Sequence, residues 1–306
     1  MLKIDYFFSK DICYRIDYGD VFFYNDMRNN IKQYESQIVI FSDLDGTLLD
    51  NQTYDFRPAL PALKIIHSRK IPLILVSSKT RTEIEFLIES LPFKTPFIAE
   101  NGGGIFFPSS FVLPQEYPFT KLGHFHVLFM GKLIKEVLEI SKKLKDDYNF
   151  RGFSEMSINE ISSLTGLPLN DALRASKREF DEPVLLDDPL CDWEIFCEKA
   201  AEHGLDCVHG GRFIHLFIGG NKGRAVKKVL DIYKQIKGAT YSIALGDSPN
   251  DISMLEIVDK AVVMQGRDGT YIECLSHPDI IKAEGNGPGI WNRVILSILE
   301  DLEIEK

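Results

Sequence analysis

Two aspartates that stand two positions apart form the first group of residues that could carry chemistry. Asp43 and Asp45 follow a short apolar run, and a glycine and a threonine come directly after them. Residues two apart on an extended backbone can point to the same side of the chain. One carboxylate could then act as a nucleophile or metal ligand while its neighbour transfers protons. A solvated acidic loop after a strand is the alternative for this motif taken alone.

A second acidic group lies near the other end of the chain. Asp247 and Asp251 lie on either side of Asn250 in the segment GDSPND, again directly after an apolar run. Four aspartates brought together from two strand ends would not remain unpaired at neutral pH. A hard divalent cation would neutralise them, and oxygen ligands of this type suit Mg²⁺. The sequence therefore predicts Mg²⁺ as a cofactor.

Two further motifs offer groups that could bind an anion. Ser77, followed by Ser78, ends another apolar run, and its hydroxyl could donate a hydrogen bond to a phosphoryl oxygen. A plain helix N-cap is the alternative for this serine. Lys222 follows a Gly-Gly-Asn segment at the start of a helical pattern, where the lysine and the positive helix end could neutralise an anion together. The spacing around Lys222 does not match the phosphate loop of nucleotide-binding proteins.

The elements that must position these residues follow a regular order. Apolar runs that predict buried strands lie at 38–42, 71–76 and 97–99, and helical patterns lie between them at 58–69 and 82–91. The same rhythm resumes with a helix over 223–236, a strand over 241–245, a helix over 251–257, a strand over 261–264 and a final helix over 290–302. This alternation predicts an α/β fold with a Rossmann-like parallel sheet, in which ligands bind beyond the carboxyl ends of the strands.

The region between the two halves of this pattern does not follow the strand–helix alternation, and it predicts an inserted α+β module. Strands are expected at 124–130, 192–197 and 213–218, and helices at 132–145, 158–165 and 171–178. The predicted division is a leader over 1–36, a core domain over 37–121 and 220–306, and an inserted domain over 122–219. The leader could form a β-hairpin, and a packing arm or partly ordered tail is the alternative.

Composition narrows the class of protein. The chain has 306 residues and a net charge of −10, which argues against a nucleic-acid partner without excluding a phosphorylated small molecule. No apolar stretch is long enough to span a membrane, and the first ten residues lack a secretory pattern. The 5 cysteines form no C-x-x-C pair and indicate reduced thiols rather than a disulfide frame or zinc site. We therefore expect a cytoplasmic protein, and its oligomeric state stays open.

The four motifs, in this order, resemble the signature of the haloacid-dehalogenase-like phosphohydrolases over about residues 37–290. Shorter runs resemble the mannosyl-3-phosphoglycerate phosphatase family within that group. These runs lie at 78–81, 100–103, 151–154, 178–183, 210–213 with His215, and 287–289 with Trp291. We expect His215 and Trp291 to pack in the core. The chain departs from the pattern at Asn221, where many relatives have Asp, and in its long leader.

The resemblance implies a role for each motif. Asp43 would form an aspartyl-phosphate, and Asp45 would protonate the leaving oxygen and then activate water. Ser77, Ser78 and Lys222 would hold the phosphoryl group. Mg²⁺ would bind Asp43, the backbone carbonyl of Asp45, and Asp247. Residues expected around the metal or the substrate are Asp251, Asn250, Lys79, Glu100, Asn101, Gly102, Arg151, Ser154, Arg178 and Arg212. For each of the basic side chains among them, a surface ion pair is the alternative.

The expected function is that of a Mg²⁺-dependent phosphatase. The inserted domain would act as a cap that selects the substrate, a phosphorylated sugar-glycerate. The first choice is mannosyl-3-phosphoglycerate, which yields phosphate and mannosylglycerate, a compatible solute. The alternatives are the glucosyl analogue, a general sugar-phosphate phosphatase, a phosphomutase that uses the same aspartate, and a catalytically retired regulatory protein.

Overall fold

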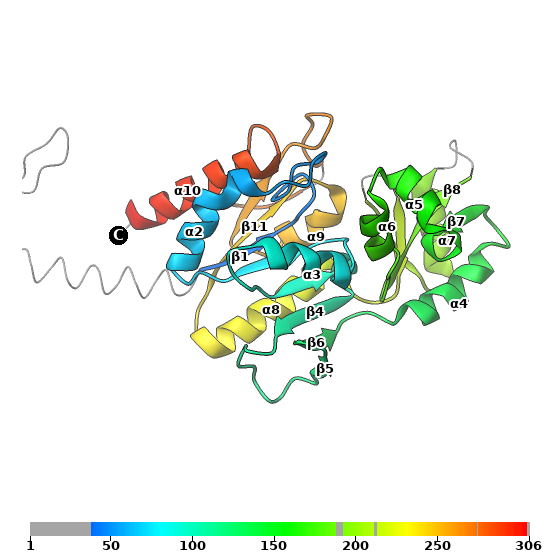
Figure 1. Ribbon diagram of the computed structural model, residues 1–306, viewed down its shortest axis with the longest axis horizontal. Helices are drawn as coiled ribbons and strands as arrows, with labels where there is room; N and C mark the ends of the chain where they lie inside the picture. Colours follow the sequence, from blue (N-terminus) through cyan, green and yellow to red (C-terminus); the bar gives the residue numbers. More distant parts are fainter. Residues whose placement is uncertain (1–37, 188–191, 211–212, 274, 305–306) are drawn as a thin grey trace, which may run out of the picture.

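A computed structural model describes residues 38–187, 192–210, 213–273 and 275–304. The leader over 1–36, with its predicted hairpin, lies outside these residues. Two sheets organise the described chain, and Figure 1 shows them side by side. Within the described ranges, no helix combines the length and apolarity needed to cross a membrane.

The larger sheet has nine strands with a parallel centre. Their spatial order is β13 (Ile280–Lys282), β12 (Lys260–Val263), β11 (Tyr241–Gly246), β1 (Ile38–Ser42), β2 (Leu73–Val76), β3 (Phe97–Ala99), β4 (Gly104–Pro108), β6 (Phe125–Phe129) and β5 (Thr120–Leu122). The first six pair in parallel, and the last three pair antiparallel. All five residues of β1 are buried, as expected for an apolar central strand covered on both faces.

Helices cover both faces of this sheet. On one face, α2 (Leu60–Ser68), α3 (Arg81–Ser90) and α10 (Gly287–Ile304) pack against alternate residues of the strands. On the other, α8 (Lys222–Lys237) and α9 (Ile252–Leu255) form a second core layer, and Figure 1 shows α2 and α10 opposite α8. This arrangement confirms the predicted α/β fold with a Rossmann-like core.

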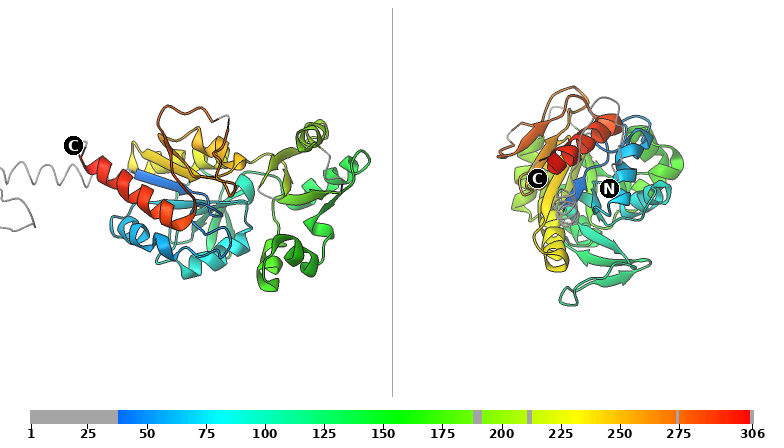
Figure 2. Two further views of the ribbon diagram at one scale, coloured as in Figure 1. Left: turned by 90° about the horizontal axis from the view of Figure 1, so that it is seen from above. Right: turned by 90° about the vertical axis from the view of Figure 1, so that its left-hand side faces the viewer.

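The smaller sheet belongs to the segment that we call the insert, residues 132–218. Its antiparallel strands are β7 (Phe150–Gly152), β8 (Asp181–Leu186), β10 (Ile214–Phe217) and β9 (Asp206–His209), in that order. Its helices are α4 (Ile134–Leu144), α5 (Ile158–Thr165), α6 (Leu169–Ala175) and α7 (Trp193–Glu202). Two apolar clusters of its own lie within it. Figure 2 shows the insert as a separate body beside the larger sheet.

The insert begins and ends at one place on the larger sheet. The carbonyl oxygen of Gly103 accepts hydrogen bonds from the backbone nitrogens of Met130 (2.9 Å) and Gly131 (3.0 Å). The next residue, Lys132, donates from its backbone nitrogen to the carbonyl of Ile218 at 2.9 Å. The outgoing and returning chains therefore lie side by side next to the start of β4.

Two sequence-based assignments differ from the structure. The strand expected at 124–130 is β6, which pairs with β4 in the larger sheet rather than with a strand of the insert. Tertiary contacts determine which strands β6 pairs with, and its own residues do not indicate them. Residues 192–197 form the start of α7 rather than a strand, because Phe196 and Ala200 fall on one buried helical face and the Asp192 side chain caps the first turn.

The prediction that all cysteines are reduced thiols is wrong for one pair. Cys197 in α7 and Cys207 in β9 form a disulfide. They are 10 positions apart along the chain, and only the packing of helix against strand brings them together. Cys13, Cys191 and Cys274 lie outside the described residues.

Candidate active site

The two central strands bring the two acidic motifs to the same edge of the sheet. Asp43 directly follows β1, and its backbone nitrogen donates to the Leu245 carbonyl in β11 at 2.9 Å. Asp247 follows β11, so the two carboxylates leave adjacent parallel strands side by side. Gly46 allows the Asp247 carboxylate to lie close to the chain after β1, because a Cβ at this position would overlap that carboxylate. Its φ of +82° also favours glycine.

Lys222 is the first residue of α8, and its side chain is 1% exposed. Its Nζ lies 2.7 Å from Oδ1 of Asp43 and 2.6 Å from Oδ1 of Asp251. Asn221 caps the helix by accepting a hydrogen bond from the backbone nitrogen of Arg224 at 2.8 Å. An aspartate at position 221 could make the same cap, so the Asn221 departure leaves the position of Lys222 intact.

Three carboxylates converge where a metal could bind. Asp43, Asp247 and Asp251 can each present an oxygen within 4.8 Å of the others. Oδ2 of Asp251 accepts hydrogen bonds from the backbone nitrogens of Asp247 and Ser248, both at 3.1 Å, which fixes the loop. Oxygen ligands of this kind suit a hard divalent cation such as Mg²⁺.

The electrostatics of this cluster also fit a cation. Burial, and then the charge of Asp251, raises the pKa of Asp43 to about 7. Burial, followed by the charge of Asp43, raises the pKa of Asp247 to about 9. The Lys222 ammonium lowers both pKa values but does not offset the crowded carboxylates. In addition, Oδ1 of Asp45 is buried with no hydrogen-bond partner among the described residues. The residues present therefore fit Mg²⁺.

Asp45 is held by a lysine from the next strand end. Its Oδ2 lies 2.8 Å from Nζ of Lys79, which also lies 3.8 Å from Oε1 of Glu83. The backbone nitrogen of Lys79 donates to Oγ of Ser77 at 3.1 Å. The Ser77 hydroxyl keeps its own hydrogen for another acceptor, such as a phosphoryl oxygen.

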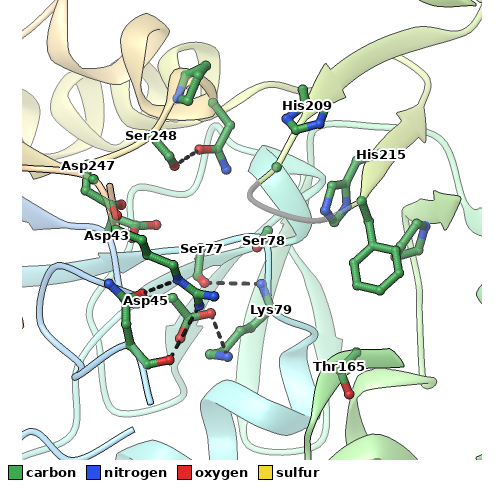
Figure 3. A pocket seen from close by; sticks show the side chains of 18 of the residues that line it. Asp43, Asp45, Ser77, Ser78, Lys79, Thr165, His209, His215, Asp247 and Ser248 are labelled. Atoms are coloured by element: carbon green, nitrogen blue, oxygen red, sulfur yellow. Dashed lines mark hydrogen bonds and ion pairs between the residues drawn. The ribbon is translucent and has the colours of Figure 1, made fainter. Parts of the chain in front are cut away.

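A cavity of about 780 Å³ opens above these groups, between the larger sheet and the insert. Asp43, Asp45, Ser77, Ser78 and Lys79 line it from the sheet side, as do Asp247 and Asn250. The insert contributes Phe153, Thr165, Phe213, His209 and His215. Figure 3 shows the two histidines across the cavity from Asp43 and Asp45. The volume suits a ligand of disaccharide size.

Residues 40–179 and 212–273 match the haloacid dehalogenase-like hydrolase family. The chain belongs to this family. It is 37% identical to the glucosyl-3-phosphoglycerate/mannosyl-3-phosphoglycerate phosphatase of Persephonella marina, over 87% of this chain and 98% of that protein. It is 35% identical to the mannosyl-3-phosphoglycerate phosphatase of Pyrococcus furiosus, over 74% of this chain and 90% of that protein. These relatives confirm the resemblance to the mannosyl-3-phosphoglycerate phosphatases.

Solved structures agree with the fold of this hydrolase. A haloacid dehalogenase-like hydrolase from B. subtilis matches it with a TM-score of 0.59 and 17% identity, covering 86% of this chain and 98% of that chain. At this level of identity the likeness concerns the fold alone.

Not all of the substrate residues expected in the insert line the cavity. Arg151 forms an exposed ion pair with Glu160 at 3.2 Å and does not line the cavity. Ser154 donates from its backbone nitrogen (2.8 Å) and hydroxyl (2.6 Å) to Oε1 of Glu182, also away from the cavity. For Arg151, the alternative of a surface ion pair describes what the structure shows. Arg212 lies outside the described residues.

Of four other expected residues, three contact both the larger sheet and the insert, and the fourth, Gly102, lies beside Asn221 at the start of α8. The buried Glu100 carboxylate accepts hydrogen bonds from the backbone nitrogens of residues 179, 180 and 181 at 2.7–3.0 Å. Arg178 lines the cavity, but its guanidinium contacts the Asp181 carboxylate and donates to the Ser78 carbonyl at 2.9 Å. Asn101 accepts a hydrogen bond from Nδ2 of Asn250 at 3.0 Å. Gly102 has a φ of +100°, and a Cβ there would overlap the backbone of Asn221.

Sequence reasoning missed several residues of the cavity. Arg267 and Asn51 lie in loops of the larger sheet, and Arg267 Nε donates to Asn51 Oδ1 at 3.1 Å. His209 and His215 come from two strands of the insert. His215 is buried, as expected, but it also faces the cavity. Trp291 is a core residue as predicted, and its Nε1 donates to the Ser42 hydroxyl at 2.9 Å.

Proposed function

We propose that this hydrolase is a Mg²⁺-dependent phosphatase acting on mannosyl-3-phosphoglycerate and on its glucosyl analogue. The products are phosphate and the corresponding glycosylglycerate, with mannosylglycerate serving as a compatible solute. The observation that carries the chemistry is the position of Asp43, beside Lys222 at 2.7 Å and at the floor of the cavity. The names of the two relatives support the substrate, and the relative from Persephonella marina carries both sugars in its name.

The chain's own residues account for both halves of the reaction. In the first half, a carboxylate oxygen of Asp43 attacks the phosphorus, and the bond from phosphorus to the glycerate oxygen breaks. Asp45 donates the proton that the leaving oxygen takes up. In the second half, Asp45 removes a proton from water, which attacks the phosphorus of the aspartyl-phosphate and frees Asp43. Ser77, Ser78 and Lys222 hold the phosphoryl oxygens in both halves.

Asp43, Asp247 and the Asp45 carbonyl would hold the metal, with Asp251 and Asn250 ordering the loop around it. Bound Mg²⁺ supplies positive charge that stabilises the charge developing on the phosphoryl oxygens. Lys222 remains beside Asp43 and shares that task.

The glycerate carboxylate needs a cation of its own. Lys79 pairs with Asp45, and the Arg178 guanidinium pairs with Asp181. Arg267 lines the cavity, and its hydrogen bonds go to the neutral side chain and backbone of Asn51. Among the described residues, no carboxylate lies within ion-pair distance of Arg267. We therefore assign the carboxylate of the substrate to Arg267.

The insert acts as the cap of this enzyme, and the division into a core and a cap is part of the proposal. It closes the cavity on the side away from Asp43 and so contacts the part of the substrate farthest from phosphorus. A cytoplasmic location also belongs to the proposal, and cell fractionation checks it.

The test is phosphate release from a panel of esters, with Mg²⁺ and with EDTA. We expect release from mannosyl- and glucosyl-3-phosphoglycerate at rates well above those for simple hexose phosphates, and loss of release with EDTA or in Asp43→Asn. Equal rates across the panel would contradict the substrate, and release indifferent to EDTA would contradict the metal. Phosphate that reappears on another hydroxyl instead of in solution would indicate a mutase.

A further inference from the structure

A buried carboxylate joins the two sides of the cavity. Asp181 begins β8 and is fully buried. Its Oδ2 lies 2.9 Å from Nδ1 of His215 and accepts a hydrogen bond from Nδ2 of Asn101 at 3.1 Å. Asn101 in turn accepts a hydrogen bond from Asn250 at 3.0 Å. A continuous chain of hydrogen bonds therefore runs from the loop beside Asp251 to a histidine of the insert.

This contact fixes which nitrogen of His215 carries a proton. Burial opposes ionisation, but the charges of Arg178 and His215 hold the pKa of Asp181 at about 2. The ionised carboxylate can only accept hydrogen bonds, so Nδ1 of His215 must be the donor. The ring is thereby oriented, and its other nitrogen, Nε2, is left for a different partner.

Gly210 lies beside Nε2 of His215. A Cβ on Gly210 would lie 2.9 Å from Nε2, so the absence of a side chain at Gly210 leaves space there. Both residues line the cavity, and no described residue forms a hydrogen bond with Nε2. Figure 3 shows His215 on the insert side, facing the loops that carry Asp45 and Lys79.

The same wall of the cavity is rich in aromatic and apolar groups. Phe153 and Phe213 meet edge to face with ring centroids 4.9 Å apart, and Leu167 and Pro183 lie in the same lining. Apolar side chains with a few polar groups among them are typical of a wall that packs against a sugar. In a glycosyl-3-phosphoglycerate, the sugar is the part that extends farthest from phosphorus.

We propose that Nε2 of His215 hydrogen-bonds a hydroxyl group of the sugar, and that Asp181 positions the ring for this contact. The inference rests on the function proposed above, since it names the part of the substrate that the insert contacts. A hydroxyl suits this position in either charge state of the ring, because it donates to a neutral Nε2 and accepts from a protonated one. His215 determines specificity, and Asp181 is a positioning residue.

Two substitutions separate binding from support of the fold. In His215→Asn, the amide nitrogen replaces Nδ1 as the donor to Asp181, and Nε2 is lost. In His215→Gln, the longer amide reaches toward the cavity and the donor to Asp181 is lost. We expect His215→Asn to raise the KM for mannosyl-3-phosphoglycerate about tenfold, with the loss falling on KM rather than on kcat. If His215 only supports Asp181, Asn keeps the wild-type KM and Gln is the damaged variant, which would overturn the proposal.

His203→Asn is the matched control. His203 also pairs with a carboxylate, at 3.2 Å from Asp147, but on the exposed surface of the insert. We expect it to keep the wild-type KM. An equal rise in KM in this control would show a general effect on the insert and would overturn the proposal.

A spectroscopic measurement does not depend on any variant folding. In the wild-type protein with ¹⁵N-labelled histidine, we expect mannosylglycerate to shift the Nε2 resonance of His215, and glycerate to leave it in place. No shift with mannosylglycerate, or the same shift with glycerate, would overturn the proposal. If the wild-type enzyme releases no phosphate from either glycosyl-3-phosphoglycerate, the proposed function fails separately, and this titration still decides the role of His215.

Discussion

The ammonium nitrogen of Lys222 lies 2.7 Å from Oδ1 of Asp43, although the two residues are 179 positions apart along the chain. The contact exists because α8 starts next to Gly102, just after β3, and the Lys222 side chain extends from there to the carboxylate at the end of β1. It places a fixed positive charge at the carboxylate that we assign as nucleophile. The same ammonium is in place for the negative charge that builds up on a transferring phosphoryl group.

Replacing Lys222 tests this charge. We expect Lys222→Met to lower kcat by about 10²- to 10³-fold, because a preorganised charge at the phosphoryl group is removed. Lys227→Met, an exposed position on the same helix, should keep the wild-type kcat. Steady-state phosphate release with mannosyl-3-phosphoglycerate is the measurement. A kcat within twofold of wild type in Lys222→Met would remove Lys222 from the reaction.

Metal binding should appear in thermal stability as well as in activity. Mg²⁺ relieves the repulsion among Asp43, Asp247 and Asp251, so we expect it to raise the Tm of the wild-type enzyme. In Asp247→Asn, the Tm shift should vanish, and the protein without metal should have a higher Tm than wild type without metal. Differential scanning calorimetry with and without Mg²⁺ gives both numbers. A full Tm shift in Asp247→Asn would exclude this aspartate as a ligand.

The carboxylate of the substrate should be bound by Arg267. We expect Arg267→Met to raise the KM for mannosyl-3-phosphoglycerate about 10- to 100-fold, since a charge-assisted hydrogen bond is lost. Hexose phosphates, which lack the carboxylate, should be affected far less. Arg151→Met is the control, because its ion pair with Glu160 is exposed and lies outside the cavity. An equal rise in KM for both substrate classes would contradict the assignment.

Arg178 should matter for stability in a way that depends on pH. Removing it in Arg178→Met takes the guanidinium away from the buried Asp181 and Glu100 carboxyl groups, at a cost of about 3 to 5 kcal/mol in the free energy of unfolding. The pKa values of both carboxyl groups then rise in the folded state. The folded variant holds more protons than the unfolded chain, so its stability falls as the pH rises.

Urea unfolding at pH 5.5 and pH 8.5 measures this effect. The deficit of Arg178→Met relative to wild type should be larger at the higher pH. Arg151→Met should cost less than about 1 kcal/mol at both values, as expected for an exposed pair. A deficit of Arg178→Met that does not change with pH would mean that the loss comes from packing rather than charge.

Gly102 should tolerate no side chain. Its φ is +100°, and a Cβ would overlap the backbone of Asn221, the residue before Lys222. We expect Gly102→Ala to lower the free energy of unfolding by about 3 kcal/mol or more and to lower kcat as well, because Lys222 is displaced. Gly123→Ala is the control. Gly123 has a φ of +57° and free space around it, so backbone strain alone should lower the free energy of unfolding by about 1 to 2 kcal/mol. Equal losses in the two variants would mean that the overlap is relieved easily.

The parts of the fold that the sequence predicts well are those that local patterns determine. The apolar runs at 38–42 and 97–99 match β1 and β3 to the residue. Strands buried on both faces need continuous apolar residues, and each ends where polar residues begin. The carboxyl ends of parallel strands share one edge, so Asp43 and Asp247 could be expected to meet there.

The remaining features depend on contacts that are distant in sequence. The residues of β6 do not indicate whether it pairs with β4 or with a strand of the insert. The pair of Cys197 and Cys207 forms only after α7 packs on β9. His215 looked like a core residue because a strand pattern tells which residues are buried, but not that a cavity lies beside them. Arg267 lies in a loop after β12, where no periodicity indicates which way a side chain points.

The hydrogen bond from Lys132 to Ile218, at 2.9 Å, brings the two ends of the insert together. Because these ends touch, a short turn could join them in place of the insert. The insert therefore adds little loop-closure entropy to the folding of the larger sheet. The chain therefore returns toward α8 and β11 from the place at which it leaves the larger sheet, whatever lies between residues 132 and 218. On the proposed function, a unit of another size in place of residues 132–218 would change which molecules are accepted and leave the groups around Asp43 where they are.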